Sequence, residues 1–258
     1  MTVHFIGAGP GAADLLTLRA VRLLQESPIC LYAGTYIDDE VLSHCGPETE
    51  LIDTAYLNLD AITATLVAAH DAGHDVARLC SGDPSIYSAI AEQTRRLDAA
   101  GVPWDLTPGV PAYAATAALI GRELTVPEVA QSVVLTRAQK DSTKMPPGET
   151  LAAFAATNAT LVLHLAIRHT RRLADELSAH YGANCPVVVG SQVTQPEELI
   201  LRGTLADIAD HVEAAGLTQA AVIIVGWALS AEGFVESHLY SSRPPRPAGE
   251  GRPDASLV

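Results

Sequence analysis

Short apolar runs alternate with longer stretches in which apolar residues recur every three or four positions, along almost the whole chain. A short apolar run between turn residues indicates a strand, whereas the longer periodic stretches indicate helices with one buried face. Regular alternation of the two predicts an α/β architecture. In the first half of the chain, strands are expected at residues 3–6, 29–33, 76–80 and 104–106, and helices at residues 14–24, 59–72 and 86–97.

A second series of the same kind follows an alanine-rich helix that ends near Gly121. Its strands are expected at residues 132–136, 160–165, 186–190, 199–202 and 220–225, and its helices at residues 150–156, 170–181 and 205–214. We therefore expect two α/β domains, residues 1–115 and 116–241, joined between about residues 112 and 124. Residues 242–258 are rich in proline, glycine and arginine and lack apolar periodicity, which is typical of a linker-like tail.

Charge and hydropathy exclude two classes of partner. The net charge of −14 argues against nucleic acid, because binding it requires a basic face that neutralises phosphates. The longest apolar runs, such as residues 220–225, are far shorter than the roughly 20 residues of a membrane helix. The sequence therefore predicts a protein that binds neither nucleic acid nor membrane.

The first residues and the cysteines indicate the compartment. The start "MTVHFIGAGPG" passes from methionine into a strand without the basic region of a signal peptide. Cys30, Cys45, Cys80 and Cys185 are widely spaced and form no C-x-x-C motif. Buried free thiols in a cytoplasmic protein fit this pattern best.

The segment "IGAGPGA" at residues 6–12 follows the first strand and precedes a helix. Gly7, Gly9 and Ala12 satisfy the G-x-G-x-x-G/A pattern of dinucleotide-binding loops. That pattern also requires an acid at the end of the second strand, but this strand ends "ICLYAG", which contains none. In addition, Pro10 removes a backbone N–H that could hold phosphate. An FAD- or NAD-binding oxidoreductase is therefore the weaker interpretation. A purely structural turn is the other alternative.

Two further loops also follow strands and precede helices, namely "CSGDPSIY" at residues 80–87 and "TPGVPA" at residues 107–112. Taken alone, Asp83 or Ser85 is expected to cap the helix that follows. Three such loops in one domain nevertheless predict a crevice at the carboxyl ends of the strands, where open α/β sheets bind ligands.

Together with "LTVPE" (residues 124–128), "VVLTRA" (133–138) and "VIIVGWAL" (222–229), these loops occur in the order and spacing of a known family. From about residue 3 to residue 229, the chain resembles the tetrapyrrole methyltransferases of cobalamin and sirohaem biosynthesis. The resemblance implies two α/β domains with the ligand cleft between them, S-adenosylmethionine as methyl donor, a tetrapyrrole substrate and a homodimer. Residues 124–138 are most similar to the members of the family that methylate C11 of precorrin-4, with or without cobalt.

The resemblance also implies that the methyl donor binds in a folded shape, largely through backbone atoms. Carried over by position, its contacts are expected at Pro10, Ser81, Gly82, Asp83, Ile86, Pro111, Ala112, Leu165, Val193 and Ala228. The first loop then lets the backbone approach the donor and the tetrapyrrole. A carboxylate such as Asp83 near the sulfonium favours the positive donor over its neutral product.

Substrate contacts are expected at Gly9, Tyr36, Tyr87, Arg137, Lys140 and Arg168. Precorrins carry several carboxylates, which arginine binds through two parallel hydrogen bonds. For the run "RHTRR" at residues 168–172, the alternative is a solvent-exposed charged face. No catalytic base is assigned, because relatives that act on uroporphyrinogen carry an aspartate after the second-strand tyrosine, where this chain has Ala33 and Gly34.

His70 and His74 lie four residues apart in "HDAGH", a spacing that is also found between metal-binding histidines. Gly73 interrupts the helix there and the glutamate of H-E-x-x-H is missing, so a solvent-exposed helix end without metal is expected. The sequence thus favours a cytoplasmic methyltransferase that converts precorrin-4 into precorrin-5. The alternatives are methylation of another precorrin position or of uroporphyrinogen III, the oxidoreductase named above, and a binding domain without catalysis.

Overall fold

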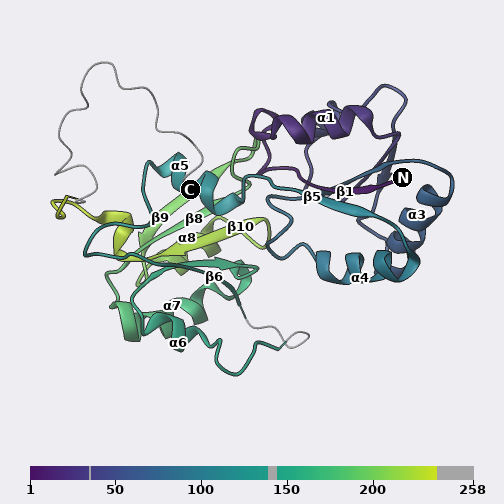
Figure 1. Ribbon diagram of the computed structural model, residues 1–258. Coiled ribbons are helices and arrows are strands. Elements are labelled where there is room, and N and C mark those ends of the chain that lie inside the picture. Colours follow the sequence, from purple (N-terminus) through teal and green to yellow (C-terminus); the bar gives the residue numbers. More distant parts are fainter. Residues whose placement is uncertain (35, 139–143, 237–258) are drawn as a thin grey trace, which may run out of the picture.

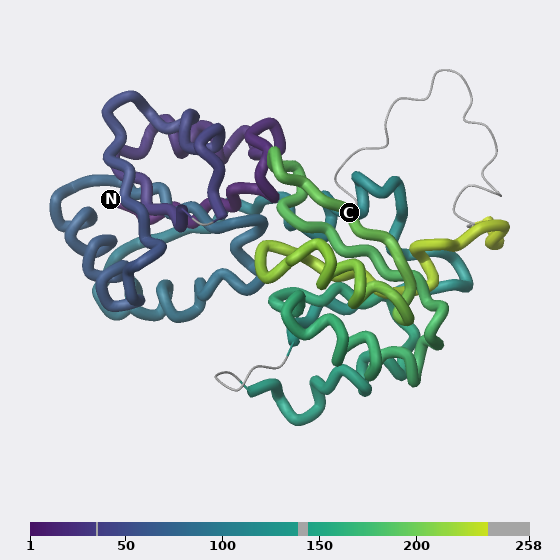
Figure 2. The backbone as a smooth tube through the Cα atoms, turned by 180° about the vertical axis from the view of Figure 1, so that it is seen from behind, coloured from purple at the N-terminus to yellow at the C-terminus, as the bar shows by residue number. Residues whose placement is uncertain are grey.

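The computed structural model describes residues 1–34, 36–138 and 144–236. Within these residues the chain forms two five-stranded sheets, one from each half of the sequence. Each sheet and its helices form one lobe, and the two lobes lie side by side (Figure 1). The view from behind shows the same arrangement (Figure 2). The predicted α/β class is confirmed.

The first sheet is parallel throughout, with the strand order β3-β2-β4-β1-β5. Its strands are β1 (Val3–Gly7), β2 (Ile29–Tyr32), β3 (Glu50–Asp53), β4 (Val76–Cys80) and β5 (Trp104–Thr107). The helical segments are η1 (Ala13–Leu15), α1 (Leu18–Glu26), α2 (Asp39–Leu42), α3 (Leu59–Asp71) and α4 (Ile90–Ala100). Helix α1 packs on one face and helices α3 and α4 pack on the other. Because all five strands run in one direction, their carboxyl ends share one edge of the sheet.

The second sheet is mixed, with the strand order β6-β7-β10-β8-β9. Its strands are β6 (Val133–Arg137), β7 (Thr160–His164), β8 (Pro186–Ser191), β9 (Leu199–Thr204) and β10 (Ala221–Val225). Strand β10 is antiparallel to both of its neighbours, whereas β6 and β7 run parallel. The helical segments are α5 (Ala112–Ile120), α6 (Leu151–Ala155), η2 (Ile167–His169), α7 (Thr170–Tyr181), α8 (Ile208–Ala214) and η3 (Trp227–Ser230).

Helices α7 and α8 cover one face of the second sheet, and α5 covers the other. Helix α5 directly follows the last loop of the first sheet, yet its apolar residues pack against β7, β8 and β10. We therefore propose that the second domain begins with α5 at Ala112, close to the boundary expected from the sequence.

Three predicted helices begin later in the structure, and the one predicted at 205–214 begins at Ile208. The helix predicted at 14–24 begins at Leu18, because Thr17 is extended and its hydroxyl oxygen accepts a hydrogen bond from Ala20 N at 3.1 Å. The start predicted at residue 86 is also wrong, since α4 begins at Ile90 after Ala89, which has a left-handed φ of 52°. Strand β3 and helix α2 show no clear pattern in the sequence, because β3 is an edge strand with mostly exposed side chains and α2 is a single turn.

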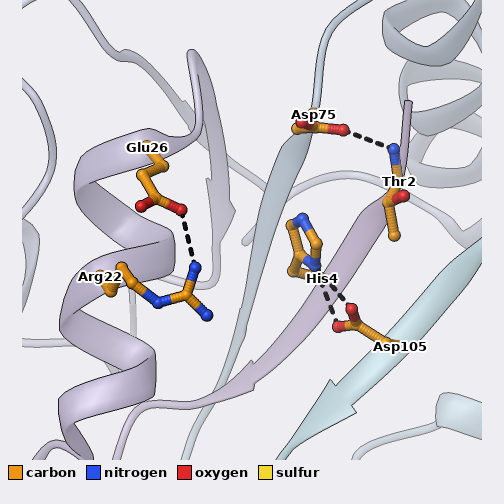
Figure 3. Close-up of polar contacts among 6 residues, drawn as sticks. All are labelled: Thr2, His4, Arg22, Glu26, Asp75 and Asp105. Atoms are coloured by element: carbon orange, nitrogen blue, oxygen red, sulfur yellow. Dashed lines mark hydrogen bonds and ion pairs between the residues drawn. The ribbon is translucent and has the colours of Figure 1, made fainter.

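Strand β1 lies between β4 and β5, and polar contacts fix its start (Figure 3). The Thr2 N–H donates to Asp75 Oδ1 at 2.6 Å, and His4 Nδ1 lies 3.0 Å from both carboxylate oxygens of Asp105 on β5. These contacts set the register of the three strands whose far ends carry the predicted loops.

The four cysteines are free thiols, and Cys30, Cys80 and Cys185 are buried, as the sequence predicted, whereas Cys45 is half-buried. In the described part of the chain, no helix is both long and apolar enough to cross a membrane.

Candidate active site

The three loops predicted to form a crevice meet at the carboxyl ends of β4, β1 and β5, which are neighbours in the sheet. Gly9 and Gly82 exchange backbone hydrogen bonds, with Gly82 N donating to Gly9 O at 2.7 Å and Gly9 N donating to Gly82 O at 3.2 Å. A Cβ on Gly109 would lie 2.8 Å from Cα of Gly7. Glycine is therefore required where the loops touch, because a side chain there would push the backbones apart.

Asp83 connects two of these loops, and its predicted role as a helix cap is wrong. Helix α4 begins seven residues later, so neither Asp83 nor Ser85 caps it. Instead, Asp83 Oδ1 accepts hydrogen bonds from the backbone N–H and the hydroxyl of Ser85, and Asp83 Oδ2 accepts one from Gly109 N at 2.9 Å. Partial burial by itself raises the pKa of the Asp83 carboxyl, but these hydrogen bonds outweigh it and hold the pKa below its ordinary value.

A cavity of about 700 Å³ lies where the two halves of the chain meet. Loops from the first sheet form one wall, and the ends of β7 and β8 with the start of β10 form the other. Two contacts connect the walls. Ala12 N donates to Thr194 Oγ1 at 3.0 Å, and Gln195 Nε2 donates to Pro10 O at 3.2 Å. The first glycine loop thus contacts the second half of the chain beside the cavity.

Nine of the residues singled out from the sequence line this cavity. Those expected to contact the methyl donor are Pro10, Ser81, Ile86, Ala112, Leu165 and Val193, and those expected to contact substrate are Tyr36, Tyr87 and Arg168. Another six are described but do not line it, namely Gly9, Gly82, Asp83, Pro111, Arg137 and Ala228. Lys140 lies outside the described residues.

Unusual backbone conformations gather around the same cavity. Eight non-glycine residues in the described chain have positive φ angles, and five of them line the cavity. These five are Tyr87, Ala89, Leu165, Gln192 and Ala220, with φ between 45° and 55°. Such conformations cost free energy and gather at ligand-binding sites, where the surrounding structure enforces them. This observation supports a binding role for the cavity independently of any motif.

Two polar residues in the cavity wall were missed by the sequence analysis. Arg78 is 8% exposed in the middle of β4, and His164 ends β7. Among the described residues His164 Nε2 is buried without a hydrogen-bond partner, and the rings of Tyr87 and Tyr113 lie 5.4 and 6.4 Å from the imidazole. Burial lowers the pKa of His164. A sequence signal existed in both cases, because each polar residue interrupts or ends a buried apolar run.

The run at residues 168–172 divides between two roles. Arg168 lines the cavity and its Nε donates to Thr218 O at 2.8 Å. Arg171 lies outside that cavity and pairs with Asp210 and Glu213 at 2.5 and 2.8 Å, as expected of an exposed charged face.

The segment after the second-strand tyrosine carries no acid of its own, but an acid from the next strand reaches it. Asp53 Oδ1, from the end of β3, accepts a hydrogen bond from Gly34 N at 2.9 Å and another from Ala55 N at 2.8 Å. These hydrogen bonds lower the pKa of Asp53, and its side chain fixes the turn that leads to Tyr36. Within the described residues, no group of three or more His, Cys, Asp or Glu side chains is arranged to hold a metal ion.

Comparison with known proteins agrees with this geometry. The family model of the tetrapyrrole (corrin/porphyrin) methylases matches residues 2–209. A precorrin-4 C(11)-methyltransferase from Rhodococcus erythropolis is 56% identical over 242 residues, which cover 94% of this chain and 97% of the relative. The X-ray structure of a cobalt precorrin-4 methyltransferase, a cobalamin biosynthetic enzyme, matches with a TM-score of 0.85 at 35% identity, covering 88% of this chain and 95% of that one.

A second solved structure carries a ligand. The uroporphyrin-III C-methyltransferase of Thermus thermophilus, complexed with S-adenosylhomocysteine, matches with a TM-score of 0.74 at 27% identity, covering 89% of this chain and 93% of that one. Sequence, fold and site geometry agree, and the chain belongs to the tetrapyrrole (corrin/porphyrin) methylase family.

Proposed function

We propose that this protein transfers the methyl group of S-adenosylmethionine to C11 of precorrin-4, giving precorrin-5, and that it acts as a homodimer in the cytoplasm. The observation that carries the proposal is the cavity between the two halves, with its three convergent loops and its five left-handed residues. The reaction is that named for the Rhodococcus relative, which matches over nearly the whole chain. Identity to that relative is 56%, against 35% for the cobalt enzyme, which favours the cobalt-free substrate.

The cavity wall suits a methyl donor with a flat aromatic ring and a charged amino-acid part. Leu165 has a φ of 52° and is 54% exposed, so a large apolar side chain is held toward a ligand rather than packed into a core. Ile86 and Val193 add further apolar surface, and Ser81 adds a hydroxyl. We propose that these residues, with Pro10 and Ala112, contact the donor directly.

The other expected donor contacts do not line the cavity. Gly82 and Asp83 connect the first-sheet loops, Pro111 precedes helix α5, and Ala228 is 1% exposed in a small apolar cluster. We propose that Gly82 and Asp83 shape the loop that presents Ser81 and Ile86. Although Asp83 does not line the cavity, its negative charge would favour a positively charged donor over the neutral product.

When bound, S-adenosylmethionine supplies an electrophilic methyl group on a positively charged sulfur. An electron-rich enamine-type carbon of the macrocycle would supply the electron pair of the new C–C bond, and the C–S bond would break with its electron pair left on sulfur. The positive charge would pass to the enamine nitrogen, which becomes neutral by releasing its N–H proton to solvent. The protein's contribution is to align carbon, methyl and sulfur and to exclude water. Tyr36, Tyr87 and Arg168 line the cavity where they can orient the tetrapyrrole.

Calorimetry of the purified protein tests the donor. We expect S-adenosylhomocysteine to bind and NAD and FAD not to bind. Tight NAD or FAD binding without S-adenosylhomocysteine binding would instead support an oxidoreductase. Turnover of precorrin-4 compared with cobalt-precorrin-4 then tests the preference for the cobalt-free substrate.

A further inference from the structure

Arg78 is a charged residue inside the first domain that the reaction described above does not use. It lies in the middle of β4, where its neighbours Ala77 and Leu79 are 0% and 2% exposed, and Arg78 itself is 8% exposed. Its side chain also reaches the wall of the cavity. Burying a cation is unfavourable unless it is paired and fully hydrogen-bonded, so its partners are informative.

Within residues 1–34, 36–138 and 144–236, the partners of Arg78 are all neutral, and all are distant. Its Nε donates to Gln93 Oε1 at 3.3 Å. Its Nη1 lies 3.3 Å from Thr54 Oγ1 and 3.5 Å from the carbonyl oxygens of Leu31 and Leu79. Strong N–H···O hydrogen bonds are centred near 2.9 Å, and those to charged groups are shorter still. The four contacts therefore compensate poorly for the lost hydration of the guanidinium.

No anion balances this charge within the described residues. Arg78 forms no ion pair with any carboxylate there. The titratable groups that act on it are two thiols. Burial raises the pKa of Cys80 to about 11, and a hydrogen bond with Cys45 together with burial raises the pKa of Cys30, so both are neutral at pH 7.

One edge of the guanidinium remains available. Nη2 donates to no described residue. It is exposed to solvent, unlike Nε2 of His164, which is buried without a partner among those residues. Nε and Nη1 make the four contacts that hold the group in place, and Arg78 is also one of the residues that line the cavity. Arginine is suited to this task because its guanidinium stays charged and its Nη2 carries two N–H groups that can donate to a carboxylate.

We propose that Arg78 binds a carboxylate of the bound ligand and so positions that ligand in the cavity. The inference rests on the proposed function, because both ligands of that reaction carry carboxylates. We assign the carboxylate to the tetrapyrrole, whose acetate and propionate side chains are the more numerous. The amino-acid carboxylate of the methyl donor is the other source of the same chemistry.

Equilibrium binding to R78Q distinguishes these sources. Uroporphyrin III is a stable tetrapyrrole with acetate and propionate side chains, and its fluorescence reports binding even if no methyl transfer occurs. R78Q should bind it about 10- to 100-fold more weakly than the wild type, the scale of one lost charged hydrogen-bond pair. Its affinity for S-adenosylhomocysteine should not change. The matched control is R22Q, which removes an exposed arginine that pairs with Glu26 at 3.0 Å on α1 and should leave both affinities unchanged.

A different pattern would assign the carboxylate to the donor. R78Q would then bind uroporphyrin III like the wild type and S-adenosylhomocysteine more weakly. It would still bind 5′-methylthioadenosine, which lacks the amino-acid part, with full affinity. Wild-type affinity of R78Q for all three probes overturns the proposal. Failure of the wild type to methylate precorrin-4, with the R78Q loss for uroporphyrin III intact, would refute only the proposed function.

R78K serves if R78Q does not fold, because lysine keeps the positive charge in the same strand. The lysine ammonium cannot keep the contacts of Nε with Gln93 and of Nη1 with Thr54 while it also binds the ligand. R78K should therefore raise the dissociation constant for uroporphyrin III about 3- to 10-fold and leave that for S-adenosylhomocysteine unchanged. Equal binding of uroporphyrin III by folded R78K and wild type contradicts the proposal in that case.

Discussion

Replacing Asp83 with asparagine tests whether one carboxylate holds two loops of the cavity together. Asp83 accepts three hydrogen bonds, two from Ser85 and one from Gly109 N at 2.9 Å. Asparagine offers one acceptor oxygen and one NH₂ group, so it can satisfy only one side. If the oxygen keeps Ser85, the NH₂ faces the Gly109 N–H, and two donors then oppose each other across the junction.

The expected cost follows from that mismatch. Leaving a partly buried N–H without its acceptor, and losing the charge of the acceptor, should destabilise the fold by about 1–3 kcal/mol. Because hydrogen bonding holds the Asp83 pKa below its unfolded value of about 3.9, this stabilisation is fully present at neutral pH. It is lost only as the pH falls below about 3.9, through the lowered folded pKa. Urea unfolding at pH 7, followed by circular dichroism, measures the difference.

The matched control is D38N. Asp38 is a true helix cap, whose Oδ1 accepts from Glu40 N at 2.8 Å, and asparagine caps as well as aspartate. D38N should therefore change stability by less than about 0.5 kcal/mol. D83N should also weaken S-adenosylhomocysteine binding, because Ser81 and Ile86 line the cavity from the same loop. The reasoning is wrong if D83N is no less stable than D38N and binds S-adenosylhomocysteine like the wild type.

Three further predictions follow from other features. A Cβ in G109A would lie 2.8 Å from Cα of Gly7, so thermal unfolding should show a free energy of unfolding lower by about 1–3 kcal/mol. G148A, with open space around its Cβ, should leave that free energy unchanged, and equal losses in the two variants would contradict the prediction. Burial lowers the pKa of His164, so the free energy of unfolding of the wild type should fall as the pH drops below about 6.5 toward that lowered pKa. In urea titrations at several pH values, H164F should show a weaker dependence of this free energy on pH. The same dependence in both proteins would exclude the effect. Light scattering should give twice the chain mass, because a mean hydropathy of +0.19 indicates apolar surface that a dimer covers; a monomer mass at all concentrations would refute the dimer.

Sequence patterns located the strands of both sheets because burial and periodicity are strong signals there, and β3 was missed because its side chains are mostly exposed. The three loops could also be predicted, since their glycines mark places where backbones touch. The start of α4 could not, because Tyr87 and Ala89 adopt left-handed conformations that no sequence rule predicts for such residues. The loop they belong to is held by Gly109, in the loop after β5, and by His164 in the second half of the chain, and both contacts are long-range in sequence.

Arg78 and His164 show the same limit within the site. Each lies in a run that predicts a buried strand, so the sequence indicates burial but not which side chain reaches a ligand. Only the packing of the two halves brings Arg78 on β4 and His164 on β7 to one cavity. Conversely, Asp83 looked like a helix cap because its partner Gly109 is 26 residues away.

The central claim is methyl transfer to one carbon of the substrate, and nuclear magnetic resonance of the product tests it most directly. The purified protein is incubated with precorrin-4 and S-adenosylmethionine whose methyl carbon is carbon-13. We predict a single labelled methyl group bonded to C11, with S-adenosylhomocysteine formed in equal amount. A labelled methyl group on another ring carbon, or no labelled tetrapyrrole from a protein that binds S-adenosylhomocysteine, would contradict the account.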